Sequence, residues 1–383
     1  METEMYDVIV VGARCAGAAT ARLLARAGRR VLLLDRADFP SDTLSTQYIH
    51  QPGLARLHRW GLLDDVLATG APSLTRVSFT VPGAHLTGPA PTLGPITGGC
   101  APRRYALDHL LVQAAVDSGV EFRPRTNAVD LHWEDGRVTG VRHGIRHGPT
   151  ALERAHLVIG ADGRNSTVAR LVRAPYLRQD RRLSRTYYSY WSALPDQGLR
   201  TYSRHSVGTA CVPTQDGATL IAVAFSRTLP AGIDGDRQRA YRQMLRRSSP
   251  ELDQQLAAAR QEDRLYCCAD QPNFFRQPHG PGWALVGDAA HTKDPINARG
   301  ITDAFTQSDM LVEQLDGPLD DTVQMEAALA KYALHLREEF TPAYENAMLA
   351  ARLDIDRYRS RMIENQHDPA FVNGCFRSFA GMP

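Results

Sequence analysis

The sequence predicts an α/β fold that begins with a Rossmann-like β-α-β unit, carries an inserted antiparallel-sheet domain and ends in a helical C-terminal segment. Three observations support this prediction. A glycine-rich turn follows a short apolar run near the N-terminus, an Asp-Gly turn follows a second apolar run, and a Gly-Asp turn follows a third. Parallel strands whose loops meet at one sheet edge typically bind a ligand there.

The first turn lies in the segment Asp7–Gly17, DVIVVGARCAG. The β-branched run at 8–11 predicts a buried parallel strand, and the small residues at 18–27 predict a helix. A second strand is expected at 31–34. This order of elements is typical of a dinucleotide-binding unit.

Residues of this unit match the chemistry of a dinucleotide. Gly12 and Gly17 permit a tight turn, the helix N-terminus favours a pyrophosphate, and Asp35 after the second strand can bind an adenosine ribose. Arg14 stands where the motif has glycine, and we hypothesise that its guanidinium lies along the phosphates. The alternative is an ordinary βα turn whose glycines serve packing.

The second turn lies in Leu157–Arg170, LVIGADGRNSTVAR. An apolar strand leads to Asp162-Gly163, and Ser166 or Thr167 starts a helix. Asp162 is expected where a loop from a third strand closes over the pyrophosphate. Asp-Gly is also a common turn pair, so an ordinary turn is the alternative.

The third turn lies in Trp283–Gly300, WALVGDAAHTKDPINARG. Its apolar run leads to Gly287-Asp288, and the Asp288 carboxylate can accept hydrogen bonds from sugar-like hydroxyls. At Gly300, backbone amides of a helix start can approach an anionic ring edge, where the helix dipole favours negative charge. A ribityl chain and a flavin ring would use both features, so the three turns together predict a flavin dinucleotide.

With these motifs the chain resembles the FAD-dependent aromatic hydroxylases, flavoprotein monooxygenases with a glutathione-reductase-like FAD fold, over roughly residues 5–340. The family is related to flavin halogenases and geranylgeranyl reductases, and usually has Gly-x-Gly where this chain has Ala298-Arg299-Gly300. The unit described above and the resemblance give these expected cofactor-binding residues: Gly12, Arg14, Gly17, Asp35, Arg36, Arg104, Asp162, Gly163, Gly287, Asp288, Pro295, Ala298 and Gly300.

The resemblance also implies an activity. NAD(P)H would reduce FAD, and a flavin 4a-hydroperoxide would transfer one oxygen atom of dioxygen to an aromatic or other electron-rich small molecule, a natural-product or catabolic intermediate. The flavin carries this chemistry, so no catalytic acid or base is assigned. No second dinucleotide fold is visible, so NAD(P)H would bind transiently or a separate flavin reductase would supply electrons.

Three alternatives remain open. A reductase of an alkene or prenyl chain shares the fold. A flavin halogenase shares it too, but needs a Trp-x-Trp-x-Ile stretch that Trp191 lacks and an early lysine, whereas the only lysines are Lys293 and Lys331. A flavin-binding protein without turnover is the third, favoured only by the altered turn at 298–300.

The domain organisation is expected to be discontinuous. An FAD-binding domain is predicted at 1–75, 100–175 and 275–340, a substrate domain at 76–99 and 176–274, and a C-terminal helical segment at 341–383. The predicted helices are 106–119, 237–260 and 321–359, the last interrupted at Pro342, and the predicted strands are 75–81, 186–194, 200–212 and 218–225, with a strand pair at 127–143 turning at Asp135-Gly136.

The substrate side offers fewer signals. In the aromatic run at 187–191, alternation puts Tyr188 and Tyr190 on one face of a strand and Tyr187 and Trp191 on the other, and the sequence does not decide which face meets the cofactor. Packing under helices is an equally good interpretation of these rings. Other candidates for substrate contact, by position alone, are His50 and Phe275.

Composition narrows the partners. The chain has 383 residues and a net charge of +2, with basic and acidic residues interleaved, so nucleic acid is not an expected partner. The six cysteines have no metal-ligand spacing, so neither a metal site nor a disulfide framework is expected. Neither a signal segment nor a membrane span is predicted, and we expect a cytoplasmic protein.

Overall fold

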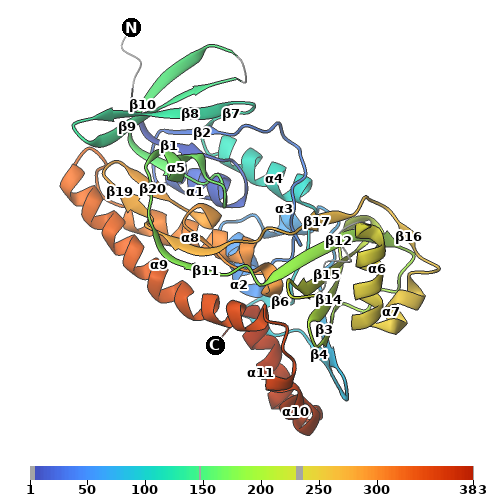
Figure 1. Ribbon diagram of the computed structural model, residues 1–383. Helices are drawn as coiled ribbons and strands as arrows, with labels where there is room; N and C mark the ends of the chain where they lie inside the picture. Colours follow the sequence, from blue (N-terminus) through green and yellow to red (C-terminus); the bar gives the residue numbers. More distant parts are fainter. Residues whose placement is uncertain (1–4, 146–147, 230–235, 383) are drawn as a thin grey trace.

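The computed structural model describes residues 5–145, 148–229 and 236–382, and it confirms the predicted α/β fold. Figure 1 shows two sheet regions, one built around the N-terminal β-α-β unit and one carrying helices on its far side. The unit consists of β1 (Tyr6–Val11), α1 (Cys15–Arg26) and β2 (Val31–Leu34). Both strands are buried, as expected for apolar runs in a parallel sheet.

The central sheet has the order β19-β20-β10-β1-β2-β7. Its parallel strands end at one level, because Val11 pairs with Leu34 and Gly160, and Gly160 pairs with Leu285. The three predicted turns therefore leave the same sheet edge. The remaining strands of this path are β7 (Glu121–Arg123), β10 (Thr150–Gly160), β19 (His279–Gly280) and β20 (Trp283–Leu285).

Helices cover this sheet. On it, α1 and α8 (Gly300–Gln314) lie side by side, where Ser308 Oγ donates to the carbonyl of Ala16 at 3.1 Å. The helix predicted at 106–119 is α4 (Arg104–Val116). The strand pair predicted at 127–143 is confirmed as β8 (Asn127–Glu134) and β9 (Arg137–Gly144), which turns at Asp135-Gly136, both with positive φ.

The inserted domain is a second sheet of order β16-β12-β15-β14-β13-β3-β4. It joins two distant stretches of sequence, because β13 pairs in parallel with β3. The strands are β3 (Arg76–Val81), β4 (Ala84–Pro89), β12 (Ser184–Ser192), β13 (Leu199–Arg204), β14 (Val207–Pro213), β15 (Thr219–Ser226) and β16 (Arg260–Gln261), and β17 (Tyr266–Cys268) pairs with β12.

Three predicted elements were wrong in detail. The single strand at 200–212 is the hairpin β13–β14, whose turn places Ser206 at φ +66° without a glycine to signal it. The helix at 237–260 is α6 (Arg237–Ser248) followed by α7 (Pro250–Gln255), because Ser249 leaves helical geometry and caps α7. Pro342 does not interrupt α9 (Thr322–Ala350), which runs through it.

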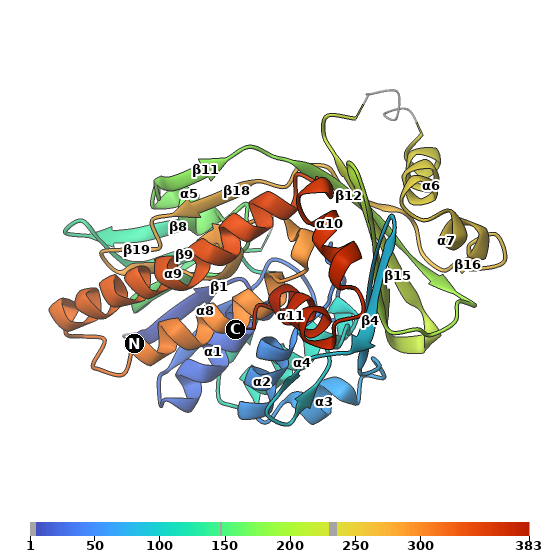
Figure 2. The ribbon, with the colours of Figure 1, turned by 90° about the horizontal axis from the view of Figure 1, so that it is seen from below.

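The helix predicted to 359 in fact ends at Ala350, and two further helices follow, α10 (Asp356–Asn365) and α11 (Pro369–Ala380). In Figure 2 they turn back from α9 onto the second sheet. Phe376 and Phe379 of α11 pack their ring edges against Phe79 of β3. The C-terminal segment therefore covers one face of the second sheet, whereas α6 covers the opposite face.

Short elements complete the described chain. A small sheet joins β11, β18 and β21, so that residues near 176 and 274 lie beside the third turn. No helix among the described residues has both the length and the apolar character needed to span a membrane. The remaining elements are α2 (Gln51–Arg59), α3 (Leu63–Leu67), β5 (Thr92–Leu93), β6 (Ile96–Thr97), α5 (Thr167–Leu171), β11 (Tyr176–Asp180), η1 (Gln215–Gly217), β18 (Asn273–Arg276), η3 (Gly287–Ala289), β21 (His291–Thr292) and η4 (Pro295–Asn297).

Candidate functional site

A cavity of about 560 Å³ lies at the edge where the three turns meet, between the central sheet and the inserted domain. Its size lies in the range usual for small-molecule and cofactor sites. Gly17 and Gly287 stand behind its wall, against neighbouring backbone and α1. The other expected cofactor residues line it: Gly12, Arg14, Asp35, Arg36, Arg104, Asp162, Gly163, Asp288, Pro295, Ala298 and Gly300.

Gly12 and Gly17 allow the start of α1 to approach the cavity closely. Gly12 has φ +102°, and a Cβ there would lie 2.6 Å from the carbonyl oxygen of Ala161. A Cβ on Gly17 would lie 1.6 Å from the carbonyl oxygen of Gly12. No side chain caps the first turn of α1, so its N–H groups remain available to an anion.

Asp35 shapes the adenosine end of the cavity. Its Oδ2 accepts a hydrogen bond from the Ala13 N–H and its Oδ1 from the Ala37 N–H, both at 2.7 Å. Each carboxylate oxygen keeps a second acceptor position, which suits ribose hydroxyls. The neighbouring Arg36 side chain is exposed along the same wall.

Two arginines meet on one buried carboxylate. Arg14 Nη1 donates to Asp108 Oδ2 at 2.6 Å, and Arg104 donates to both oxygens of Asp108 at 3.0 and 2.9 Å. Burial opposes the charge of Arg104, but Asp108 outweighs it and raises the pKa of the guanidinium. Arg14 also donates to the carbonyl of Ser41 at 3.2 Å, so it fastens the loop after β2 to the start of α1. With two arginines and one aspartate, the cluster has a net charge of +1.

The carboxylate of Asp162 is used within its own turn. It accepts from Ser166 Oγ at 2.5 Å and from the Thr167 N–H at 2.6 Å, and so caps α5. Burial raises its pKa although these hydrogen bonds favour the ionised form. Asp162 therefore fixes the shape of the loop, while Gly163, with φ +80°, and Arg164 present the loop to the cavity.

Asp288 is different, because its carboxylate makes no hydrogen bond among the described residues. Its side chain is exposed to the cavity, although the protein around the cavity still desolvates the carboxylate. Burial raises the pKa of Asp288, with Arg164 and Lys293 acting in the opposite direction. An uncommitted acceptor of this kind fits a polyol chain.

The turn at 298–300 leaves room beside a helix start. Ala298 adopts φ +50°, the left-handed conformation that glycine would take without strain. A Cβ on Gly300 would meet no atom within 4 Å, and no side chain caps α8. Lys293 and Arg299 both pair with Asp303 beside this turn. Burial alone would raise the pKa of Asp303, but the two cations lower it by a larger amount, so the pKa of Asp303 lies below its usual value.

The structure decides which aromatic face meets the cavity. Tyr188 lines it and Tyr190 lies beside it, donating to Gln47 Oε1 at 2.8 Å, whereas Tyr187 and Trp191 pack toward α6. The Gln47 side chain is itself part of the cavity wall.

The structure does not bring His50 or Phe275 to the cavity wall. The His50 ring is buried against Phe379, and burial lowers its pKa to about 3. Phe275 packs against His291 and Tyr344. Several other wall residues had no signal in the sequence. They come from the loop after β2, from β12, from β17 and the loop that follows it, and from the third turn: Thr43, Leu44, Ser45, Thr46, Gln47, Tyr48, Thr186, Cys268, Gln271 and Asn297.

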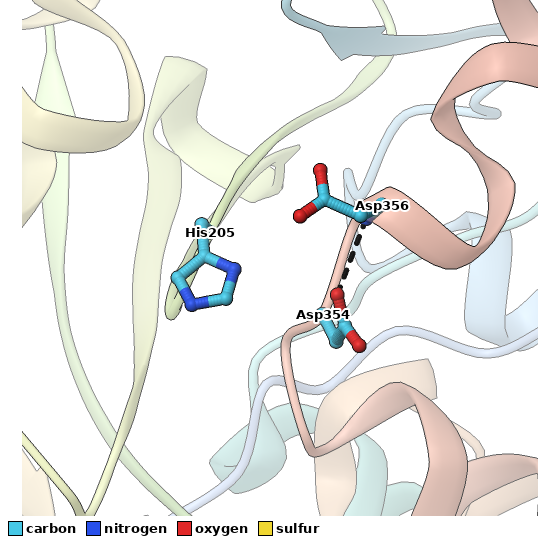
Figure 3. A group of neighbouring side chains, drawn as sticks. All are labelled: His205, Asp354 and Asp356. Carbon is cyan, nitrogen blue, oxygen red and sulfur yellow. Dashed lines mark hydrogen bonds between the residues drawn. The ribbon is translucent and has the colours of Figure 1, made fainter.

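A second group of polar side chains, His205, Asp354 and Asp356, gathers between the β13–β14 turn and the start of α10 (Figure 3). The Asp354 carboxylate accepts the Asp356 N–H at 3.2 Å, which explains its place at the helix start. His205 and Asp356 are exposed, and nothing further there indicates a bound ion.

The comparisons with known proteins agree with this geometry. A family model described as FAD binding domain matches residues 5–332. Menaquinone reductase of Mycolicibacterium smegmatis is 27% identical, covering 77% of this chain and 72% of that protein. The 6-methylpretetramide 4-monooxygenase of Streptomyces rimosus is 29% identical, covering 81% and 76%. The solved flavin-dependent brominase Bmp2 superposes with a TM-score of 0.84 at 18% identity, covering 98% and 94%, which shows a shared fold.

The chain therefore belongs to the FAD-binding domain family. It is an FAD-dependent oxidoreductase, and its cofactor is FAD. The residues present fit that cofactor. Gly12 and Gly17 leave the start of α1 accessible to a ligand, the Asp288 carboxylate can accept hydrogen bonds, and there is open space beside Gly300.

Proposed function

We propose that this protein is an FAD-dependent monooxygenase that inserts one oxygen atom of dioxygen into a small aromatic or similarly electron-rich molecule, with NAD(P)H as electron donor. The packing of the C-terminal segment on one face of the second sheet supports this activity over reduction of a prenyl chain. On the apolar face of the second sheet, α11 packs Phe376 and Phe379 against Phe79, so the protein's own rings occupy a surface that an apolar chain could otherwise cover. The wall that the inserted domain contributes to the cavity carries polar groups, on Thr186, Tyr188 and Gln271.

Residues of the three turns would hold the cofactor. The uncapped start of α1, together with Arg14 and Arg104, would bind the pyrophosphate, and Asp35 with Arg36 the adenosine. Asp288 would accept ribityl hydroxyls, and the N–H groups at the start of α8 would face the ring edge that becomes anionic on reduction. Gly17 and Gly287 would allow the close packing, and Gly163, Pro295 and Ala298 would shape the loops around the ring.

FAD supplies the redox chemistry and the activation of dioxygen when it is bound. The protein's contribution is to position the substrate and to exclude water. Tyr188 would form part of the substrate wall, and Tyr190 would hold Gln47 in place behind it. The Tyr188 hydroxyl accepts the Ser45 N–H at 3.0 Å, so the inserted domain is fastened to the loop after β2. Burial raises the pKa of Tyr188, which keeps its phenol neutral.

The direct test is isotope incorporation. The FAD-loaded protein is incubated with NADPH and ¹⁸O₂ over a panel of phenols, indoles and quinones, and the products are analysed by mass spectrometry. A monooxygenase adds one ¹⁸O atom per NADPH consumed. Substrate-dependent flavin reoxidation without oxygen would favour the reductase alternative. The similarity to menaquinone reductase supports this alternative. Absence of ¹⁸O-containing product across the panel, both with and without an added flavin reductase, would reject the proposal.

A further inference from the structure

The last turn of α11 reaches the turn at 298–300 from behind the cavity wall. A Cβ built on Gly381 would overlap the guanidinium of Arg299, so this guanidinium lies directly against the backbone of Gly381. Gly381 has φ +71° and ends α11, where its N–H donates to the carbonyl of Ser378 at 3.1 Å. The carboxyl end of a helix has partial negative charge, which favours a guanidinium there. Glycine at this position therefore leaves room for the Arg299 side chain.

Arg299 joins this helix end to the start of α8. Its Nε lies 3.5 Å from Oδ1 of Asp303, and its side chain is 15% exposed and forms part of the cavity wall. The Nε makes no hydrogen bond among the described residues. The position of the guanidinium is therefore set by the ion pair with Asp303 on one side and by the end of α11 on the other.

Phe379 provides a second connection to the same turn. Its ring packs edge-on against the His50 ring, with 4.9 Å between the ring centroids, and His50 Nε2 lies 2.9 Å from the carbonyl oxygen of Asn297. Burial lowers the pKa of His50 to about 3, so the ring is neutral, and Nε2 carries the hydrogen because a carbonyl only accepts. Ala298 and Phe379 also pack against the same apolar cluster. One connection from α11 thus reaches residue 297 and the other reaches residue 299.

We propose that Phe379 and Gly381 form a C-terminal clamp, which fixes the turn at 297–300 in the conformation that receives the flavin ring. Both are positioning residues, because neither lines the cavity. The turn needs such support, since Ala298 adopts φ +50°, a conformation that is strained for alanine. The inference rests on the proposed position of the ring and not on the oxygen-transfer reaction.

Binding titrations of the FAD-free protein test the clamp without any turnover. Gly381→Ala puts a methyl group where the Arg299 guanidinium lies. Gly61→Ala is the matched control, because Gly61 follows α2 with φ +74° and the same backbone hydrogen-bond pattern, but a Cβ there meets no atom within 4 Å. Both variants carry similar backbone strain, and only one displaces Arg299. The measured quantities are the Kd of FAD and the Kd of ADP, the part of FAD that lacks the ring and the ribityl chain.

Gly381→Ala is expected to weaken FAD binding about tenfold, within the range for residues that interact directly, and to leave the Kd of ADP within about twofold. Gly61→Ala should change neither Kd. The double variant Gly381→Ala/Arg299→Gln should bind FAD no more weakly than Arg299→Gln alone, because both substitutions break the same contact.

The clamp is rejected if Gly381→Ala and Gly61→Ala have the same FAD affinity, if ADP binding weakens as much as FAD binding, or if the two losses add in the double variant. If Gly381→Ala does not fold, Phe379→Leu tests the other connection by the same titrations. Weaker FAD binding with unchanged ADP binding would then support the clamp, and an unchanged Kd of FAD would reject it.

Two further outcomes separate the clamp from the proposals on which it depends. If Gly300→Leu abolishes FAD binding while Gly381→Ala leaves the Kd of FAD unchanged, the ring position is supported and the clamp is wrong. If oxygen insertion fails while Gly381→Ala weakens FAD binding selectively, the clamp is supported and the proposed reaction is wrong.

Discussion

Arg14 reaches from the start of α1 to Asp108 on α4, with 2.6 Å between Nη1 and Oδ2, although 94 positions separate the two residues in sequence. Arg104 holds the same carboxylate from the other side, and the Cys15 thiol donates to it at 3.3 Å. The position where the dinucleotide motif has glycine is thus occupied by a side chain that links α1, α4 and the loop after β2.

Asp108→Asn should lower the free energy of unfolding by about 3 kcal/mol, because the buried Arg104 guanidinium would lose the carboxylate that balances it. Urea denaturation of the FAD-free protein measures this change. Asp117→Asn, at the C-cap of the same helix, is the control, since that side chain is exposed and should shift stability by less than about 0.5 kcal/mol. Equal stability of the two variants would show that the cluster does not support the fold.

Arg14→Ala should weaken FAD binding about tenfold, because the α1 start loses a positive charge next to the proposed pyrophosphate position. The dependence of the Kd on salt should also become shallower. Fluorescence titration with FAD at two ionic strengths measures both effects. An unchanged Kd would remove Arg14 from the cofactor site and leave it as a link between α1 and the loop at Ser41.

Gly12 and Gly300 should respond to substitution in opposite ways. Gly12→Ala places a Cβ 2.6 Å from the carbonyl oxygen of Ala161 at positive φ, so it should destabilise the fold itself. Gly300→Leu meets no atom within 4 Å of its Cβ, so the FAD-free protein should fold normally but fail to bind FAD. Thermal unfolding and flavin content separate the two outcomes. Normal FAD binding by Gly300→Leu would contradict the proposed ring position.

Asp288→Asn should stabilise the FAD-free protein at neutral pH. Burial raises the pKa of Asp288 in the native state, so the native protein binds this proton more tightly than the unfolded chain. Stability contributed by this group is therefore lost as pH rises from the usual aspartate value of 3.8 through the raised native one. The asparagine variant should not show this loss, which denaturation between pH 4 and 7 would reveal.

The same substitution should weaken FAD binding, because the amide replaces an anionic acceptor with a neutral one. A variant that gains stability and loses FAD affinity would mark Asp288 as a binding group rather than a structural one. If Asp288→Asn changed neither quantity, the ribityl assignment would be wrong.

The parts of the fold that sequence predicted well are those where local pattern and tertiary position agree. The apolar runs before Gly12, Asp162 and Gly287 are strands whatever surrounds them, and their order alone implies that their loops meet at one edge. The face of β12 could not be predicted, because Tyr188 and Trp191 are both buried and only the position of α6 distinguishes them.

The errors have a common physical cause. The turn at Ser206 is held by its N–H, which donates to the carbonyl of Leu353 at 2.8 Å, a contact across nearly 150 positions that no local pattern contains. Phe275 and His50 lie near the motifs in sequence, yet neither side chain lines the cavity. The His50 ring packs against Phe379, and the Phe275 ring packs against His291. Proximity along the chain was a poor guide to the lining of the cavity, because the wall also draws on the loop after β2 and on β17.

The strand order has a consequence for biosynthesis. On the ribosome, β1 can pair with β2 and then with β10 as these strands emerge, but β10 waits for β20, so the central sheet cannot be completed until nearly three quarters of the polypeptide has been translated. The hairpins β13–β14 and β14–β15 need only nearby partners, and β12 pairs with β15 within the same stretch of the chain. We therefore expect the inserted domain to acquire structure while the edge of β10 at 158–160 is still unpaired, so that the sheet begun first is completed last.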